Sequence, residues 1–164
     1  MNEKQSKPVS LSRVTLTQLM LPQHANALGN VHGGVIMKMV DEAGALVAMR
    51  HAQTQVVTVA IDSMTFMKPI YVGSLVTYDA EITYVGRSSM EVRVQVRAEN
   101  PLTGAGTITN TAYLVYVALS PEGTPTTVPE LIYDTPQQHT RAAEAQERQA
   151  YRKKQRTQEE AYHE

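Results

Sequence analysis

Two kinds of hydrophobic pattern occur along the chain, one typical of a helix and one typical of strands. From residue 33 to about residue 51, apolar side chains cover all faces of a helix. This predicts a long helix in the core. Other segments are rich in β-branched residues or alternate in polarity, which is typical of strands. These predicted strands are residues 12–19, 56–67, 74–85, 89–99 and 107–119.

The most regular alternation lies between residues 89 and 99, where Met90, Val92 and Val94 alternate with Glu91 and Arg93. One dry face and one wet face are typical of strands in an antiparallel sheet. The expected fold class is therefore α+β. One curved antiparallel sheet should wrap the long central helix, because nothing else in the chain could cover it. The outer face of that sheet would then need a partner, which predicts at least a dimer.

The two ends of the chain differ from the middle. Residues 1–10 are polar and are expected to form a flexible arm, whereas residues 11–134 form the domain proper. Residues 135–164 are rich in good helix formers and predict a charged helical extension, either solvated or packed on a partner. Within it, Glu144 and Arg148 have the spacing of an ion pair on one helix face.

Charge and composition exclude several classes of function. The chain has 15 basic and 16 acidic residues, a net charge of -1 and no cysteine. We therefore expect no nucleic-acid or membrane partner, and we interpret the basic run 152–156 as a charged helix face. The absence of cysteine excludes a Cys nucleophile and Cys-ligated zinc. The N-terminus lacks a signal-peptide pattern, and no apolar run is long enough for a membrane span, so a cytoplasmic location is expected.

The candidate chemistry lies where a glycine-rich turn opens into the apolar helix. Asp41 is a carboxylate about two turns into that helix, where an unpaired charge is costly. It could act as a general base or as a nucleophile, or it could simply pair with Lys38. Gly33 and Gly34 allow a substrate to approach the backbone closely, and the N–H of Gly34 or Val35 could hold an oxyanion. Together these features suggest hydrolysis of a carbonyl compound.

Other residues are weaker candidates. His32 is a possible loop contact to substrate. No HxH or HExxH spacing occurs, so we expect no metal. The sequence also lacks a GxSxG motif, which argues against a serine esterase. Arg87, Ser88 and Ser89 lie in a tight connection between two strands, and they form either a phosphate cradle or an ordinary hairpin turn.

Five ordered blocks between about residues 11 and 131 resemble the hotdog-fold acyl-CoA thioesterases of the acyl-CoA hydrolase family. They are 25–34 together with Asp41, 57–66, 69–73, 84–90 and 109–112. The resemblance implies a long helix wrapped by a curved antiparallel sheet. It also implies a homodimer with sheets joined edge to edge, often assembled into a hexamer as a trimer of dimers.

The resemblance also implies where the active site lies. Asn26 of one subunit would cooperate with Asp41 of the other, positioning the water or the thioester carbonyl. The alternative role of Asn26 is to form a turn or to cap the helix, for which Asn30 is better placed. The Arg87–Ser89 turn would contact the phosphates of CoA. The expected activity is hydrolysis of fatty acyl-CoA to free acid and CoA without a cofactor. The alternatives are a non-catalytic acyl-CoA sensor and another hotdog thioester enzyme, such as an enoyl-CoA hydratase.

Overall fold

The structure is a computed structural model that describes residues 5–162, with the side chains of residues 5–159. Its elements follow the order β1 (Lys7–Pro8), η1 (Val9–Leu11), β2 (Val14–Leu19), η2 (Pro22–His24), α1 (Gly33–Ala52), β3 (Gln55–Ile61), β4 (Leu75–Val85), β5 (Ser89–Glu99), β6 (Gly106–Leu119), β7 (Leu131–Ile132) and α2 (Pro136–Tyr162).

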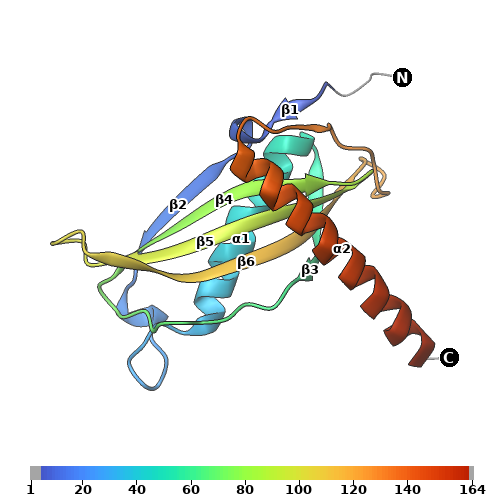
Figure 1. Cartoon of the computed structure of the whole chain (residues 1–164). Coiled ribbons are helices and arrows are strands. Elements are labelled where there is room, and N and C mark those ends of the chain that lie inside the picture. Colours follow the sequence, from blue (N-terminus) through green and yellow to red (C-terminus); the bar gives the residue numbers. More distant parts are fainter. Residues whose placement is uncertain (1–4, 163–164) are drawn as a thin grey trace.

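A curved five-stranded antiparallel sheet forms the body of the molecule, with α1 against one face (Figure 1). The strand order is β2-β4-β5-β6-β3, so that β2 and β3 are the two edges. The inward residues of β5 alternate as the sequence predicts, and Met90, Val92 and Val94 are fully buried. The expected long helix and antiparallel sheet are therefore confirmed.

Only one side of α1 is covered by the sheet. The helix begins after His32 and ends where Gln53 adopts a left-handed conformation, with φ of 55°. Ile36, Val40 and Val47 on its inner side are buried, whereas Met37, Leu46 and Met49 on other sides are about two-fifths exposed. The sequence predicts burial on all faces. In one chain this holds only for the face toward the sheet, because the sheet is curved but does not close around the helix.

The strand expected over residues 56–67 is shorter in the structure, because β3 ends at Ile61. The segment after it still follows β6, but through separate contacts and not through a continuous ladder. The Asp62 N–H donates to the Tyr113 carbonyl at 2.9 Å, and the Asn110 side-chain amide donates to the Thr65 carbonyl at 2.7 Å. Side-chain partners thus replace part of the backbone pairing along this segment.

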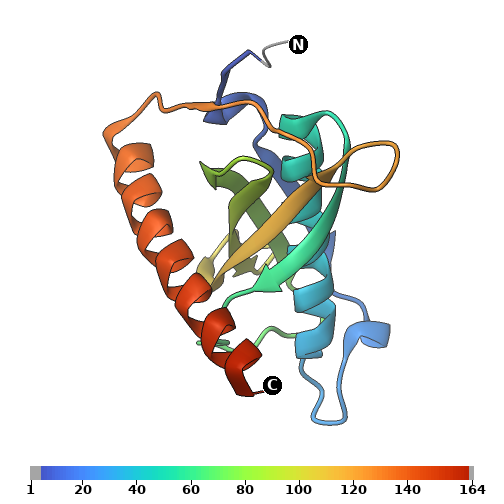
Figure 2. The same ribbon diagram turned by 90° about the vertical axis from the view of Figure 1, so that its right-hand side faces the viewer.

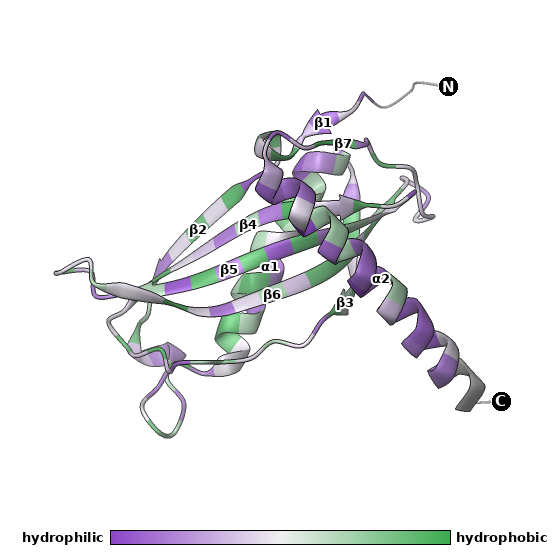
Figure 3. Cartoon of the chain, in the orientation of Figure 1, coloured by the Kyte–Doolittle hydropathy of each residue, from purple (hydrophilic) through white to green (hydrophobic). Residues whose placement is uncertain are grey.

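Helix α2 lies on the face of the sheet opposite α1 (Figures 1 and 2). It is largely hydrophilic, in contrast to the greener α1 (Figure 3), and it attaches through charged groups. Arg148 donates to Glu91 at 2.8 Å and lies over the Tyr113 ring, and Arg152 bridges Glu91 and Asp62. The outer face of the sheet is therefore covered in part by the chain's own extension, and an open sheet face alone no longer predicts a dimer.

This contact also corrects the expectation for the extension. Arg148 makes its ion pair with Glu91 on the sheet and not with Glu144. Ala142 and Ala145 are buried, since small side chains let the helix approach the sheet closely. Neither helix in the described part of the chain is both long and apolar enough to cross a membrane.

The expected N-terminal arm is partly attached to the domain. Residues 1–4 lie outside the described residues. Lys7 and Pro8 pair in parallel with Leu131 and Ile132, and Val9 is 1% exposed. The Lys7 ammonium donates to the His51 carbonyl at 2.8 Å. Burial of Val9 explains why this segment packs on the body of the domain despite its polar surroundings.

Candidate active site

Asp41 lies on α1 facing β6 and β3, and two hydroxyls hold one of its carboxylate oxygens. Thr58 Oγ1 donates to Asp41 Oδ1 at 2.8 Å, and the Tyr116 hydroxyl donates to the same oxygen at 3.0 Å. Within the described residues, Oδ2 accepts no hydrogen bond. The carboxylate is thus fixed through one oxygen, while the other is available to a water or to a substrate.

The alternative in which Asp41 serves only as an ion-pair partner of Lys38 is not observed. Lys38 instead pairs with Glu42 at 3.7 Å, and both side chains are exposed. Among the described residues Asp41 makes no ion pair, so its neighbours are hydroxyl groups and not cations.

A small cavity of about 310 Å³ lies at the N-terminal end of α1. It is bordered by Asn26, Asn30, Gly33, Phe66 and others of the segment 66–70. Asn26 Oδ1 accepts the N–H groups of Leu28 at 2.9 Å and of Asn30 at 3.2 Å. Asn26 therefore forms the turn, which is one of its two expected roles. Its side-chain N–H₂ donates to no group in the described part of the chain, so it can still serve a ligand.

The N–H groups at the start of α1 differ in availability. The His32 ring caps the helix, because its Nδ1 accepts from the Gly34 N–H at 2.9 Å. The Val35 N–H donates to the His32 carbonyl at 3.0 Å. The Gly33 N–H has no acceptor among the described residues. A Cβ at Gly33 would lie 3.3 Å from the Phe66 ring, so glycine keeps this side of the cavity open.

Asn26 and Asp41 do not meet within one chain. Asn26 and Gly33 share the small cavity, whereas Asp41 does not border it. Eight residues of α-helix separate Gly33 from Asp41, a rise of about 12 Å. One chain therefore carries two separate half-sites: Asn26 with Gly33 at the start of α1, and Asp41 with Thr58 and Tyr116 further along.

The turn of Arg87, Ser88 and Ser89 lies at the end of the sheet near Tyr116, the residue that contacts Asp41. Ser89 is paired with Val117, the neighbour of Tyr116. The small cavity lies toward the other end of β6, because the Met67 N–H beside it donates to the Thr109 carbonyl. Eight strand residues separate Thr109 from Val117, a distance of roughly 27 Å along β6. The turn is therefore far from the small cavity of the same chain. The Arg87 side chain is exposed and bonds to no described residue, so it can meet a ligand from solvent.

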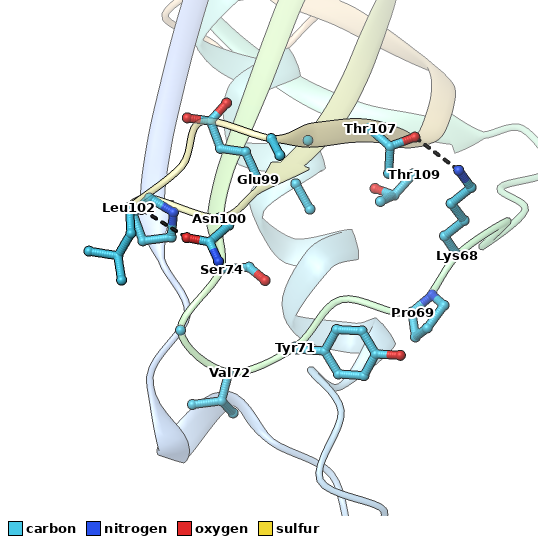
Figure 4. Close-up of a pocket in the computed structure, with 15 residues that line it drawn as sticks. Lys68, Pro69, Tyr71, Val72, Ser74, Glu99, Asn100, Leu102, Thr107 and Thr109 are labelled. Atoms are coloured by element: carbon cyan, nitrogen blue, oxygen red, sulfur yellow. Dashed lines mark hydrogen bonds between the residues drawn. The ribbon is translucent and has the colours of Figure 1, made fainter.

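Another cavity, of about 730 Å³, is lined by none of the site residues predicted from the sequence. Figure 4 shows it between the β5–β6 connection and the segment 68–74, with Lys68 donating to Thr107 at 3.1 Å. A second contact within its lining joins the Asn100 side-chain oxygen, which accepts, to the Leu102 N–H at 2.8 Å. In the described part of the chain no three His, Asp or Glu side chains are placed to hold a metal ion.

Three residues near the candidate groups were not assigned a role from the sequence: Thr58, Tyr116 and Phe66. Thr58 and Phe66 fall inside the blocks that carry the resemblance, but one sequence does not reveal which helix residue they face. The available signal for Tyr116 is Gly44, a glycine inside the helix three residues after Asp41. A glycine in a helix interior is destabilising unless a neighbour approaches closely.

Comparisons with known proteins point to one family. The model of the thioesterase superfamily matches residues 28–105. An uncharacterized acyl-CoA thioester hydrolase of Bacillus subtilis is 36% identical over 132 residues, which are 80% of this chain and 73% of that protein. A cytosolic acyl coenzyme A thioester hydrolase of Mus musculus is 44% identical over 113 residues, or 65% of this chain. The chain spans only 30% of the length of the mouse protein.

Solved structures agree over nearly the whole chain. An acyl-CoA hydrolase from Staphylococcus aureus, in complex with butyryl coenzyme A and coenzyme A, has a TM-score of 0.89 and 35% identity, covering 95% of both chains. Variants of that enzyme with alanine in place of an aspartate, an asparagine or a threonine have similar structures. A hexameric acyl-CoA thioesterase has a TM-score of 0.89 and 40% identity, covering 92% of this chain and 97% of its own.

Proposed function

Because the chain belongs to the acyl-CoA thioester hydrolases of the thioesterase superfamily and has their hotdog fold, we propose that it hydrolyses acyl-CoA to a free acid and CoA. The observation that carries this proposal is the geometry of Asp41. Its Oδ1 is held by Thr58 and Tyr116, and its Oδ2 is available. A carboxylate fixed in this way is suited to remove a proton from water or to attack a carbonyl.

The complete site is formed by two subunits. Each chain carries two half-sites about 12 Å apart along α1, so a symmetric dimer can bring Asn26 of one subunit to Asp41 of the other. The exposed edge β3 supports such an interface, because Val57, Val59 and Ile61 are 43–54% exposed on it. Met37 on α1 adds to this apolar surface.

The spacing of three residues supports the assignment. In the Staphylococcus aureus enzyme, the asparagine, aspartate and threonine that were replaced by alanine are separated by 15 and 17 positions. Asn26, Asp41 and Thr58 are separated by the same 15 and 17 positions here. The three residues of this chain are therefore candidates for the corresponding roles.

In this proposal, the start of α1 binds the thioester carbonyl. The Gly33 N–H is the available donor, whereas the N–H groups of Gly34 and Val35 are engaged by His32. The Gly33 N–H would stabilise the oxyanion that forms when water, or Asp41 itself, attacks the carbonyl carbon. The Asn26 amide would position the water or the carbonyl. When water attacks, Asp41 takes its proton, and the sulfur of CoA leaves as the thiol after receiving a proton from Asp41. When Asp41 attacks, CoA leaves first, and water then hydrolyses the resulting anhydride to the free acid and restores the carboxylate. No cofactor takes part.

Arg87, Ser88 and Ser89 are the candidates for binding the phosphates of CoA. The supporting observation is that the Arg87 side chain is exposed, while the backbone of this turn is bonded to β6 and to the segment that follows it. The Val128 N–H donates to the Arg87 carbonyl at 3.0 Å, and the Ala118 N–H donates to the Ser88 carbonyl at 2.9 Å. A cation on a rigid turn meets an anion with little loss of conformational freedom.

The hexamer is part of the same proposal. Hexameric thioesterases among the similar structures support this assembly, with dimers as the expected unit and three of them in the hexamer. We propose the cytoplasm as the location, in keeping with the cytosolic mouse relative.

The test is release of free CoA thiol from a series of acyl-CoAs, from acetyl to long-chain, with product analysis. Wild type should release thiol and free acid. Asp41→Asn should lose at least about a hundredfold in kcat, the scale of a positioned acid or base. Glu42→Gln is the matched control, because it removes the adjacent exposed carboxylate of α1 and should retain activity.

The outcomes separate the alternatives. Tight binding of acyl-CoA without thiol release would favour the sensor, which has the same fold. Addition of water to an enoyl-CoA without thiol release would favour a hydratase. Loss of activity in Glu42→Gln, with activity kept in Asp41→Asn, would show that Glu42 and not Asp41 is the base.

A further inference from the structure

Resting on the proposed hydrolase function, we propose that Tyr116 is a positioning residue that orients the Asp41 carboxylate, and that Gly44 is required for this contact. The Tyr116 hydroxyl shares its hydrogen between the Asp41 carbonyl and Oδ1, both at 3.0 Å. The phenol thus bonds the backbone and the side chain of the same residue. This double contact restricts rotation of the carboxylate, whose Oδ2 accepts no hydrogen bond from the described residues.

Tyr116 is well suited to act as a fixed donor. Its side chain is fully buried in the sheet on β6, paired with Met90 on one side and Thr58 on the other. Burial, the charge of Asp41 and the hydrogen bond to it, in that order, raise the pKa of Tyr116 well above its ordinary value. The phenol therefore remains protonated at any pH at which the enzyme works.

Gly44 makes room for the phenol. A Cβ at Gly44 would lie 3.0 Å from Tyr116 Cζ and closer still to the hydroxyl. Real Cβ atoms do not approach so closely, so alanine would displace the ring. The glycine costs helix stability, roughly 0.5–1 kcal/mol relative to alanine, and the contact between Tyr116 and Asp41 accounts for its presence.

Other groups around Asp41 do not replace this contact. From β3, Thr58 supplies the second hydroxyl on Oδ1. From α1, Lys38 and Glu42 pair with each other and are exposed. Within the described residues, Tyr116 is thus the titratable side chain of the sheet that bonds to the Asp41 carboxylate. Tyr116 does not line the small cavity.

The variant that tests the inference is Tyr116→Phe, which removes one oxygen and keeps the ring. We expect kcat to fall about tenfold, or about 1.4 kcal/mol, with KM changed by less than about twofold. The acid limb of the plot of kcat/KM against pH should move to higher pH, because the ionised carboxylate loses a donor. A purely structural role would lower stability without moving this limb.

Tyr78→Phe is the matched control. Tyr78 is also fully buried in the sheet, but its hydroxyl has no partner among the described residues. This variant should keep the wild-type kcat and pH profile. Gly44→Ala approaches the same contact from the other side and should reproduce the kinetic change of Tyr116→Phe. Kinetics of Tyr116→Phe that match those of Tyr78→Phe would overturn the inference.

A failure of the proposed function is distinguishable from a failure of this inference. Wild-type protein that releases no thiol from any acyl-CoA would contradict hydrolysis. The contact is then tested by a double-mutant cycle of unfolding with Tyr116→Phe and Asp41→Ala. Coupling that changes the unfolding constant by at least about threefold would support the positioning contact, and additive effects would overturn it.

Discussion

Replacing Arg148 by alanine should detach the middle of α2 from the sheet and lower the stability of the fold. The Arg148 guanidinium donates to Glu91 from Nη2 at 2.8 Å and from Nε at 3.3 Å. The Glu91 side chain is only 1% exposed, so its charge depends on donors from the protein. Burial alone would lower the pKa of Arg148, but the bond and charge of Glu91 outweigh it, and the pKa is raised. The removed group is therefore a cation.

The size of the effect follows from these contacts. Lost hydrogen bonds to a buried charge cost about 1.5–3 kcal/mol. The guanidinium also lies 3.7 Å from the centre of the Tyr113 ring, a contact that contributes about 0.5–1 kcal/mol. Glu91 keeps Arg152 and Thr83 as donors, which limits the loss. We expect destabilisation of about 2–4 kcal/mol, or roughly 5–15 °C in Tm for a chain of this length.

The assay is thermal and urea unfolding followed by circular dichroism, at one protein concentration because an oligomer's stability depends on it. Lys153→Ala is the matched control, since it removes an exposed cation from the same helix and should change stability by less than about 0.5 kcal/mol. Arg148→Ala that unfolds together with wild type would refute the view that buried ion pairs attach α2 to the sheet.

Further predictions concern the ligand sites and the tyrosines. Arg87→Ala should raise KM for acyl-CoA more than for a short thioester without the nucleotide, and equal effects would remove Arg87 from the CoA site. Gly33→Ala should place a methyl against Phe66 and lower kcat/KM at least about tenfold with little change in Tm, measured by thiol release and melting. Burial raises the pKa values of Tyr78 and Tyr116 above their ordinary value of 10.0, so the unfolded chain loses these protons first as the pH rises. Their contribution to the free energy of unfolding should be full below pH 10.0 and fall above it. A free energy of unfolding that stays constant above pH 10.0 would contradict this.

The sequence predicts the fold closely, because the fold depends on local patterns. Alternation between residues 89 and 99 predicts the dry inner face of β5, and the glycine pair before an apolar run predicts the start of α1. The boundaries that fail depend on long-range contacts. β3 ends at Ile61, and beyond it the Asp62 side chain bonds to Arg152 and the Thr65 carbonyl accepts from the Asn110 side chain, partners that are far away in the chain.

The candidate site is predicted less completely. Asp41 is evident as a carboxylate within an apolar helix, but Thr58 and Tyr116 are ordinary strand residues until the register places them beside it. The sequence predicts the charged extension as a helix that is either solvated or packed on a partner, because the sheet residues that pair with its arginines are far away in the chain. Likewise, the sequence does not reveal that His32 caps the helix and engages the Gly34 N–H.

The most direct test of a site shared between subunits is complementation. Asn26→Ala and Asp41→Asn should each be nearly inactive alone. Co-expressed, they should form mixed dimers in which one of two sites has both native residues, restoring up to about a quarter of wild-type thiol release per chain. A mixture no more active than the separate variants would contradict an active site that is completed across the interface.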